Sequence, residues 1–183
     1  MVKPFGSARL SGGIATRARL PGYVGDDYWL PDPDPILRRL GRSIEVYREL
    51  LSDPHVGGAV RRRKAAVKAM ERGVDRGKAK SRIARTIESA LDRLDMDRII
   101  SEILDAPLFG YQPLEVMWGN REGLWLPEDI VGKPPEWFHF DQSNRLRFRS
   151  KDNFCDGELL PDRKFLLARQ DPAYDNPYGF SDL

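Results

Sequence analysis

Paired carboxylates are the side chains in this sequence best suited to catalysis, since neighbouring carboxylates can hold Mg²⁺ for phosphodiester cleavage. The candidate pairs are Asp26 with Asp27, Asp95 with Asp97, and Glu128 with Asp129. A two-metal site needs carboxylates that converge from several elements, whereas each pair here lies on one expected helix or loop. We therefore predict solvated acidic pairs, with no metal site and no catalytic residue.

Histidine and cysteine chemistry is sparse. The histidines, His55 and His139, lack the spacing of a zinc or iron site. We expect His55 to be a polar residue in the first turn of a helix. His139 alternates with two phenylalanines, so we expect it on the opposite face of a strand, as a solvated or interface residue. The single cysteine, Cys155, excludes an intramolecular disulfide and is expected to be an unreactive loop thiol.

The strongest charge feature is a basic stretch between Arg61 and Arg85, where eleven basic residues meet two acidic ones for a net charge of +9. From Thr86 onward the balance is −8. The stretch could be a solvated helix face, could contact DNA phosphates without sequence preference, or could pair with an acidic region of a neighbouring copy. It contains no aromatic residue, so base stacking is not expected. Its candidate contact residues are Arg61, Arg62, Arg63, Lys64 and Lys68.

The elements that would position these side chains begin after residue 33. Residues 1–33 are rich in Gly, Pro and Arg without sustained periodicity, which predicts a flexible arm. Tyr23, Tyr28 and Trp29 would anchor this arm on a neighbouring subunit or on its own domain. No glycine-rich phosphate loop is present, and we expect no cofactor.

Three helices are expected next. Asp34 followed by Pro35 predicts a helix cap, with a helix over residues 35–51. Asp53–Pro54 begins a second helix, although residues 68–74 could instead form a short strand. The longest helix is expected over residues 79–104, because apolar residues such as Ile83, Ile87 and Ile99 lie on one side and need a partner to cover them.

Residues 111–169 change to a β-type pattern of short apolar runs separated by turn residues. Residues 145–149 alternate strictly between arginine and apolar side chains, which predicts a half-exposed strand, and residues 141–144 suggest a hairpin turn. The sequence thus predicts one α+β domain over residues 34–183, with amino-terminal helices packed on a small, mainly antiparallel sheet.

Glu115 lies within an apolar run, Leu114–Trp118, that follows a helix end at Ala106–Pro107 and a redirection at Gly110. A carboxylate in such a setting must find a partner or face water. An ion pair, with an arginine of the basic stretch as one candidate partner, is one interpretation. A solvent-facing side chain is the preferred one, because the flanking residues point to the other side of the strand.

Four segments in a fixed order resemble the amino-terminal part of portal proteins of Mu-like tailed phages and prophages. They are Asp53–Val56 with the basic run to Lys68, Phe109–Trp118, Pro134–Asp141, and Asn176–Gly179. The resemblance covers roughly residues 30–183. It implies structural roles for Phe109, Gly110, Glu115, Trp118, Trp137, Phe138, Asn176, Pro177, Tyr178 and Gly179.

The resemblance implies a structural subunit without an active site, assembled as a ring of about twelve copies at one capsid vertex. Double-stranded DNA would pass through the ring during packaging and ejection, and terminase, head-completion and tail proteins would dock on it. The protein would belong to the virion, and to the host cytoplasm during assembly. The chain would be the wing-like part of a truncated subunit that ends before the tunnel-lining region, so we expect a monomer or small assembly in isolation.

The sequence also favours a soluble protein with no membrane partner, since no apolar run approaches the roughly 18–20 residues of a membrane span. Two alternative functions remain. One is a Mg²⁺-dependent DNA-processing enzyme that uses the acidic pairs. The other is a small, sequence-independent DNA-binding module of a mobile element, which would bind through residues 61–68.

Overall fold

The computed structural model describes Ile14, Asp34 and Leu37 together with residues 44–153, 156–173 and 175–183. The predicted arm, apart from Ile14, lies outside the described residues, and so do Cys155 and the acidic pair Asp26–Asp27. Among the described residues, no helix is long and apolar enough to cross a membrane.

Asp34 and Asp53 accept hydrogen bonds from the backbone N–H groups that follow them, as predicted. Asp34 accepts a hydrogen bond from the Leu37 N–H at 3.3 Å and another from the Tyr47 hydroxyl at 2.6 Å. Helix α3 itself covers Glu45–Leu50 and begins after Ile44, whose side chain makes no capping hydrogen bond. Helix α4 covers Pro54–Lys68, and the Asp53 side chain accepts from two backbone N–H groups of its first turn. The strand alternative for residues 68–74 is wrong, because residues 69–80 form turns and irregular structure.

The predicted long helix over residues 79–104 is two helices, α5 (Ser81–Leu91) and α6 (Met96–Ile103). The break is at Asp95, whose side chain caps α6 by accepting from the Arg98 N–H at 3.0 Å. The break also changes the expected apolar stripe. Ile99 is buried, whereas Ile83 and Ile87 on α5 are 51% and 44% exposed.

A short helix, α7 (Ala106–Phe109), follows α6, so the Ala106–Pro107 pair begins a helix and does not end one. Pro107 fits its first turn, where a missing N–H costs nothing. Gly110 then reverses the chain with φ of 83°. This left-handed conformation favours glycine and directs the chain into the first strand.

The strands form two antiparallel three-stranded sheets, which confirms the predicted α+β class. One sheet has the order β2-β1-β6, with β1 at Tyr111–Arg121, β2 at Leu124–Gly132 and β6 at Phe165–Arg169. The other has the order β3-β4-β5, from Phe138–Phe140, Leu146–Phe148 and Glu158–Leu159. The hairpin predicted at residues 141–144 joins β3 to β4.

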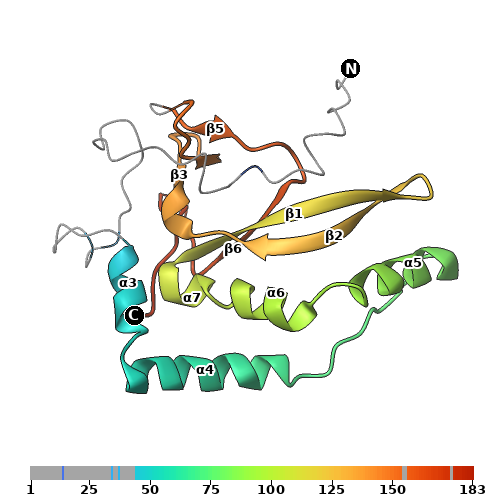
Figure 1. Cartoon of the computed structure of the whole chain (residues 1–183), viewed down its shortest axis with the longest axis horizontal. Coiled ribbons are helices and arrows are strands. Elements are labelled where there is room, and N and C mark those ends of the chain that lie inside the picture. The colour runs from blue at the N-terminus through green and yellow to red at the C-terminus, as the bar shows by residue number, and fades with distance from the viewer. Residues whose placement is uncertain (1–13, 15–33, 35–36, 38–43, 154–155, 174) are drawn as a thin grey trace.

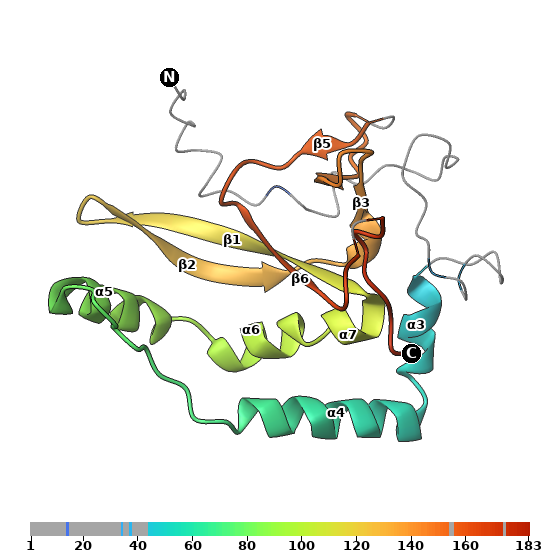
Figure 2. The ribbon, with the colours of Figure 1, turned by 180° about the vertical axis from the view of Figure 1, so that it is seen from behind.

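The helices lie in layers under the β2-β1-β6 sheet. Helices α5, α6 and α7 follow one face of the long β1–β2 hairpin, and α4 lies beyond α6 (Figure 1). The reverse view shows the same order, with β3 and β5 on the other side of the hairpin (Figure 2). The tip of the hairpin and α5 therefore form one end of the described molecule, and α3 and the carboxyl terminus form the other.

Two apolar clusters hold these layers together. The larger joins aromatic residues from α3, α7, β1, β3, β4 and the carboxyl-terminal segment, and its buried members are Leu37, Ile44, Tyr47, Leu108, Phe109, Tyr111, Phe138, Phe140, Phe148 and Tyr178. The smaller joins Leu94, Ile99 and Leu114, between α6 and β1. The first cluster fixes the segments that define the candidate site.

Candidate interface: a motif core and a basic helix

Asn176–Gly179 forms a closed turn. The Asn176 side chain accepts a hydrogen bond from the Tyr178 N–H at 3.1 Å and donates one to the Gly179 carbonyl at 2.9 Å. Gly179 has φ of 77°, and a Cβ built there would lie 2.1 Å from the Gln170 carbonyl oxygen. The turn therefore requires glycine at this position both for its backbone conformation and for the space it leaves.

This turn packs directly on the chain reversal after α7. A Cβ on Gly110 would lie 3.0 Å from the Tyr178 carbonyl oxygen, so the two backbones approach closely. The Gln170 N–H donates to the Gly110 carbonyl at 2.8 Å, and the Phe180 N–H donates to the Gln170 carbonyl at 3.0 Å. The segments at residues 109–111 and 176–179 thus form one unit.

The third segment joins this unit through Tyr178. Its ring makes edge-on contacts with Tyr111 and Phe140, with centroids 5.4 and 4.8 Å apart. Its hydroxyl oxygen accepts from the Phe140 N–H at 3.1 Å, and the Tyr111 hydroxyl donates to the Pro135 carbonyl at 2.8 Å. We call this group the motif core, and it comprises Phe109, Gly110, Tyr111, Phe138, Phe140, Asn176, Pro177, Tyr178 and Gly179.

Glu115 is fully buried, with 0% of its surface exposed, so the preferred solvent-facing interpretation is wrong. Its carboxylate lies 3.2 Å from the Lys133 Nζ and 3.7 Å from the Lys164 Nζ. The ion-pair interpretation is correct in kind, but the partners are lysines and not arginines of the basic stretch. The backbone N–H of Ile14 also donates to this carboxylate.

Lys164 is also fully buried. Burial lowers its pKa, and the charge of Glu115 opposes that effect. Its ammonium donates to the Val116 carbonyl at 2.8 Å, so the charge is both paired and hydrogen-bonded. Lys133 follows β2 and Lys164 precedes β6, and Glu115 therefore ties together all three strands of its sheet.

The two tryptophans lie at the edges of these groups. The Trp118 indole N–H donates to the Arg163 carbonyl at 2.8 Å and joins β1 to the turn before β6. Trp137 is partly buried against the large apolar cluster. Trp137 thus lies beside the motif core, whereas Trp118 lies outside it.

His139 is buried, with 1% exposure, so the expectation of a solvated histidine is wrong. The reason is Gly157, which packs on the strand face opposite the phenylalanines. A Cβ at Gly157 would lie 2.5 Å from the His139 Cε1. Burial, together with the nearby Arg149 and Arg147, lowers the pKa of His139 to about 4, so the ring is neutral at pH 7. His55, as predicted, is exposed in the first turn of α4.

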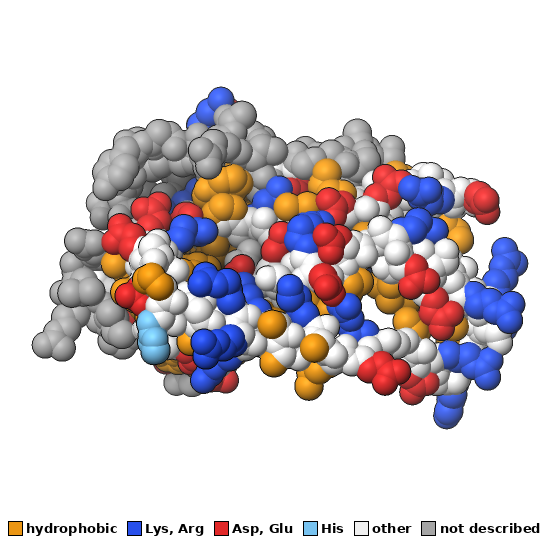
Figure 3. Space-filling model, turned by 60° about the horizontal axis from the view of Figure 1, so that its bottom comes forward, with side chains coloured by type: hydrophobic (Ala, Val, Ile, Leu, Met, Phe, Trp, Pro, Cys, Tyr) orange, Lys and Arg blue, Asp and Glu red, His pale blue; other side chains and the backbone are white. Residues whose placement is uncertain are grey.

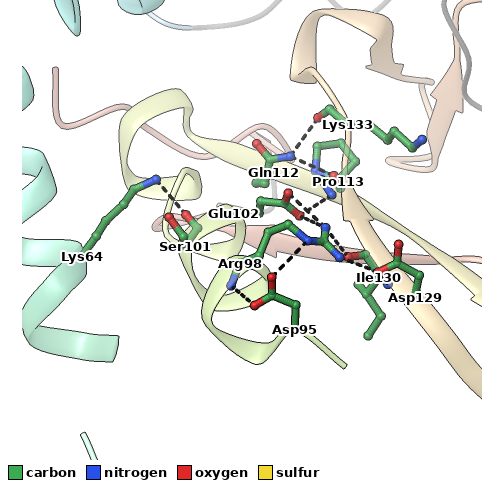
Figure 4. A network of polar contacts seen from close by, with 11 residues as sticks. Lys64, Asp95, Arg98, Ser101, Glu102, Gln112, Pro113, Asp129, Ile130 and Lys133 are labelled. Atoms are coloured by element: carbon green, nitrogen blue, oxygen red, sulfur yellow. Dashed lines mark hydrogen bonds and ion pairs between the residues drawn. The ribbon is translucent and has the colours of Figure 1, made fainter. Parts of the chain in front are cut away.

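Arg98 is the centre of a polar network that joins α6 to β2 (Figure 4). Its guanidinium donates to Glu102 at 3.2 Å, to the Ile130 carbonyl at 3.0 Å, and to Asp129. Glu102 in turn accepts from the Gly132 N–H at 2.6 Å. This network fixes the angle between the helix layer and the long hairpin.

The described acidic pairs are engaged in such contacts. Asp97 pairs with Arg72 at 2.7 Å, and Glu128 pairs with Arg121 at 3.0 Å, while Asp95 caps α6. Within the part of the chain that the structure describes, no three His, Cys, Asp or Glu side chains gather as a possible metal site. No observation among these residues favours the acidic pairs as a Mg²⁺ site.

The five basic residues predicted as contacts separate into two sets. Arg61, Arg62 and Arg63 are exposed on α4, and no ion pair joins them to another described residue. Lys64 points inward instead, toward the Ser101 carbonyl at 2.7 Å and the Asp105 carboxylate at 2.5 Å. Lys68 is half-buried. Basic side chains gather over α4 and at the α5 end of the molecule (Figure 3).

Sequence reasoning missed Lys133, Lys164 and Arg98. Asp95, Arg98 and Glu102 have the three- and four-residue spacings of paired charges on a helix, so this part of the network was visible in the sequence. The lysines gave no such signal, because their contact with Glu115 depends on how β1, β2 and β6 pair. The exposed arginines of α4 can contact a negatively charged surface. The motif core is a rigid part of the same fold.

A comparison with known protein families identifies the family of this chain. Residues 44–183, well over half of the chain, match the family described as the portal protein of Mu bacteriophage. The chain therefore belongs to this family. None of the curated proteins compared with the chain matches it.

Proposed function

We propose that this chain is a structural subunit of a phage or prophage portal ring, which forms the channel for double-stranded DNA at one vertex of the capsid. The single observation that carries the proposal is the family match over residues 44–183. The ring would serve packaging and ejection of DNA, and terminase, head-completion and tail proteins would dock on it. About twelve copies would make up the complete ring, which would belong to the virion after assembly in the host cytoplasm.

The structure supports a mechanical role more than a chemical one. The family segments pack into a motif core held by backbone hydrogen bonds and edge-on aromatic contacts, which is a rigid arrangement without an open cleft of reactive groups. The buried histidine is neutral at pH 7, and the buried lysine is paired with a carboxylate. These groups stabilise the fold, and we propose that the chain has no catalytic activity of its own.

The exposed arginines of α4 fit a ring that handles DNA. A channel that lets DNA slide benefits from contacts with backbone phosphate, which do not depend on base sequence. Contact with DNA and contact with a neighbouring subunit remain the two proposed roles for Arg61, Arg62 and Arg63. Lys64 is assigned instead to the contact between α4 and α6, because it is already paired.

The test is made in the genome that encodes this chain. Replacing Gly179 with Val removes the turn that closes the motif core, and Gly123→Val is the matched control because a Cβ there meets nothing within 4 Å. We expect Gly179→Val to give heads without DNA and without tails, counted by electron microscopy, while Gly123→Val leaves most heads filled. Normal yields of DNA-filled, infectious particles with Gly179→Val, despite loss of the folded chain, would contradict the proposal.

A further inference from the structure

An open groove lies between α5 and the tip of the β1–β2 hairpin, with a volume of about 800 Å³. Arg82 and Arg85 of α5 and Arg93 just beyond it line the helix side, and Leu124 and Leu126 of β2 line the strand side. We call it the arginine groove. It lies at the end of the molecule opposite the motif core (Figure 1).

The groove is both positive and apolar. It contains four arginines, the three above and Arg121, against one acidic residue, Glu122, for a net charge of +3. Of these four arginines, only Arg121 has an ion-pair partner among the described residues, Glu128. Leu124 is 52% exposed and lies beside these arginines. The occupant should therefore carry carboxylates and apolar side chains together.

Duplex DNA fits this lining poorly. Its backbone offers negative charge but no apolar surface for the leucines. A protein segment that contains both acidic and apolar residues can contact the arginines and the leucines of the groove. Residues 26–32 of this chain, Asp-Asp-Tyr-Trp-Leu-Pro-Asp, have that composition, with three aspartates, three large apolar side chains and no basic residue. Their charge of −3 equals the groove's charge in magnitude.

In its own subunit, Trp29 of this segment is too far from Leu124 to cover it. Asp34 is held by Tyr47, and Tyr47 belongs to the same apolar cluster as Tyr111 at the start of β1. The ten residue steps of β1 from Tyr111 to Arg121 span about 33 Å at roughly 3.3 Å per residue. Trp29 lies five residues before Asp34, so it extends at most about 17 Å from it. The ends of the molecule that carry α3 and α5 are opposite (Figure 1).

We propose that residues 26–32 of one copy bind in the arginine groove of the next copy, as a heterologous contact that closes the portal ring. Asp26 and Asp27 would pair with arginines of the groove, and Trp29 would cover Leu124. A contact between two different surfaces of identical chains is the kind that generates rings. The inference rests on the proposed function, because the neighbouring copy is a subunit of that ring.

Cysteine cross-linking in trans tests the contact with the full chain. Cys155→Ser is made first, and then Trp29→Cys in one preparation and Leu124→Cys in a second preparation with a different affinity tag. After mixing and oxidation with copper phenanthroline in air, we expect a disulfide-linked dimer that carries both tags. Leu159→Cys is the matched control, because Leu159 is similarly exposed at 57% but lies on β5, away from the groove.

Charge reversal identifies what holds the segment. Arg82→Glu with Arg85→Glu on the Leu124→Cys chain should abolish the cross-link, and Asp26→Arg with Asp27→Arg on the Trp29→Cys chain should restore it. No more cross-link with Leu124→Cys than with Leu159→Cys would overturn the inference. So would a cross-link confined to one chain that carries both cysteines, or duplex DNA binding that depends on Arg82 and Arg85 without any cross-link.

Failure of the groove contact and failure of the portal function give different experimental outcomes. If the wild-type chain supports DNA-filled heads but the Trp29→Cys and Leu124→Cys chains give no specific cross-link, the groove contact alone is overturned. A specific cross-link from a chain that is dispensable for packaging supports the contact and overturns the portal function.

Discussion

At the scale of single residues, the ion pair between Glu115 and Lys164 is unusual because neither side chain is exposed to water. Removing one partner of a buried pair leaves the other charge without compensation, which is far costlier than losing a surface pair. Lys133 is a second cation beside the same carboxylate. The stability of the β2-β1-β6 sheet should therefore depend on Glu115 more than on any exposed carboxylate.

Glu115→Ala should lower the free energy of unfolding by about 3–5 kcal/mol. Chemical denaturation by urea, followed by tryptophan fluorescence, measures the change. Arg72→Ala is the control, because it removes one partner of a half-exposed pair, and it should cost less than about 1 kcal/mol. Adding Lys164→Met to Glu115→Ala should recover part of the loss. A change for Glu115→Ala as small as that of the control would show that the buried pair does not stabilise the fold.

His139 makes stability depend on pH. Its pKa falls from 6.5 in the unfolded chain to about 4 in the folded one, first because it is buried and then because of the nearby arginines. The unfolded chain thus binds more protons between these values. The stabilisation from a neutral ring is complete above pH 6.5 and is lost as the pH falls toward 4, by a total on the order of 3 kcal/mol.

The measurement is the urea midpoint at several pH values between 7 and 4.5. The wild type should lose stability through this range, and His139→Gln should show a shallower loss. His55→Gln is the matched control and should keep the wild-type slope, since His55 is exposed.

Titration of Asp141 does not contribute to the change in stability over this pH range. Although burial raises its pKa, hydrogen bonds from Arg145, Arg147 and Ser143 bring it to about 2, below this window. Equal slopes for the wild type and His139→Gln would contradict the prediction.

At the scale of elements, local sequence patterns predicted most of the fold. The Asp53 cap of α4, the hairpin at residues 141–144 and most strands were visible because each depends on residues close in sequence, whereas β5 was not expected. The break at Asp95 was missed because the apolar stripe continues across it. The burial of Glu115 and His139 could not be predicted, since it depends on Lys164 and Gly157, which reach them only through strand pairing.

The candidate site was predictable to a lesser degree. The family segments were recognised as separate runs, but their meeting in one motif core depends on the close approach of Gly110 to the turn at Tyr178 and Gly179. Likewise, composition could not show that Arg61–Arg63 are exposed while Lys64 points inward, because all four are consecutive basic residues. Lys64 points inward because it pairs with Asp105, and this pair forms only when the chain is folded.

Two glycines with similar backbone angles allow the turn at residues 176–179 to be tested as an element. Gly179 and Gly123 have φ of 77° and 82°, so alanine at either position pays about 1–2 kcal/mol for the left-handed conformation. Only at Gly179 does the added Cβ also meet a backbone oxygen, at 2.1 Å. Gly179→Ala should therefore lower the melting temperature clearly more than Gly123→Ala in thermal scans. Equal shifts would mean that the turn opens without cost to the motif core.

At the scale of the whole molecule, exposed basic side chains lie on two separate surfaces, the arginine groove and α4. The arginine groove at the α5 end has an apolar wall of Leu124 and Leu126, whereas the exposed arginines of α4 lie on an open helix surface. Three consecutive arginines on a helix point in different directions around it, so they suit a diffuse charged surface better than one specific partner. We therefore expect α4 to contact DNA phosphate.

Replacing Arg61, Arg62 and Arg63 with alanine should weaken binding to unrelated DNA duplexes to the same extent. It should also reduce the slope of log affinity against log salt concentration by about 2–3, since each phosphate contact contributes roughly 0.9. The matched control is a triple alanine variant of Lys151, Arg163 and Arg169, exposed residues elsewhere whose loss changes net charge equally. Fluorescence anisotropy across a salt series measures both. If the two variants lose affinity and slope alike, net charge and not α4 attracts the DNA. If the α4 variant keeps its affinity but self-associates less, its surface contacts a neighbouring subunit.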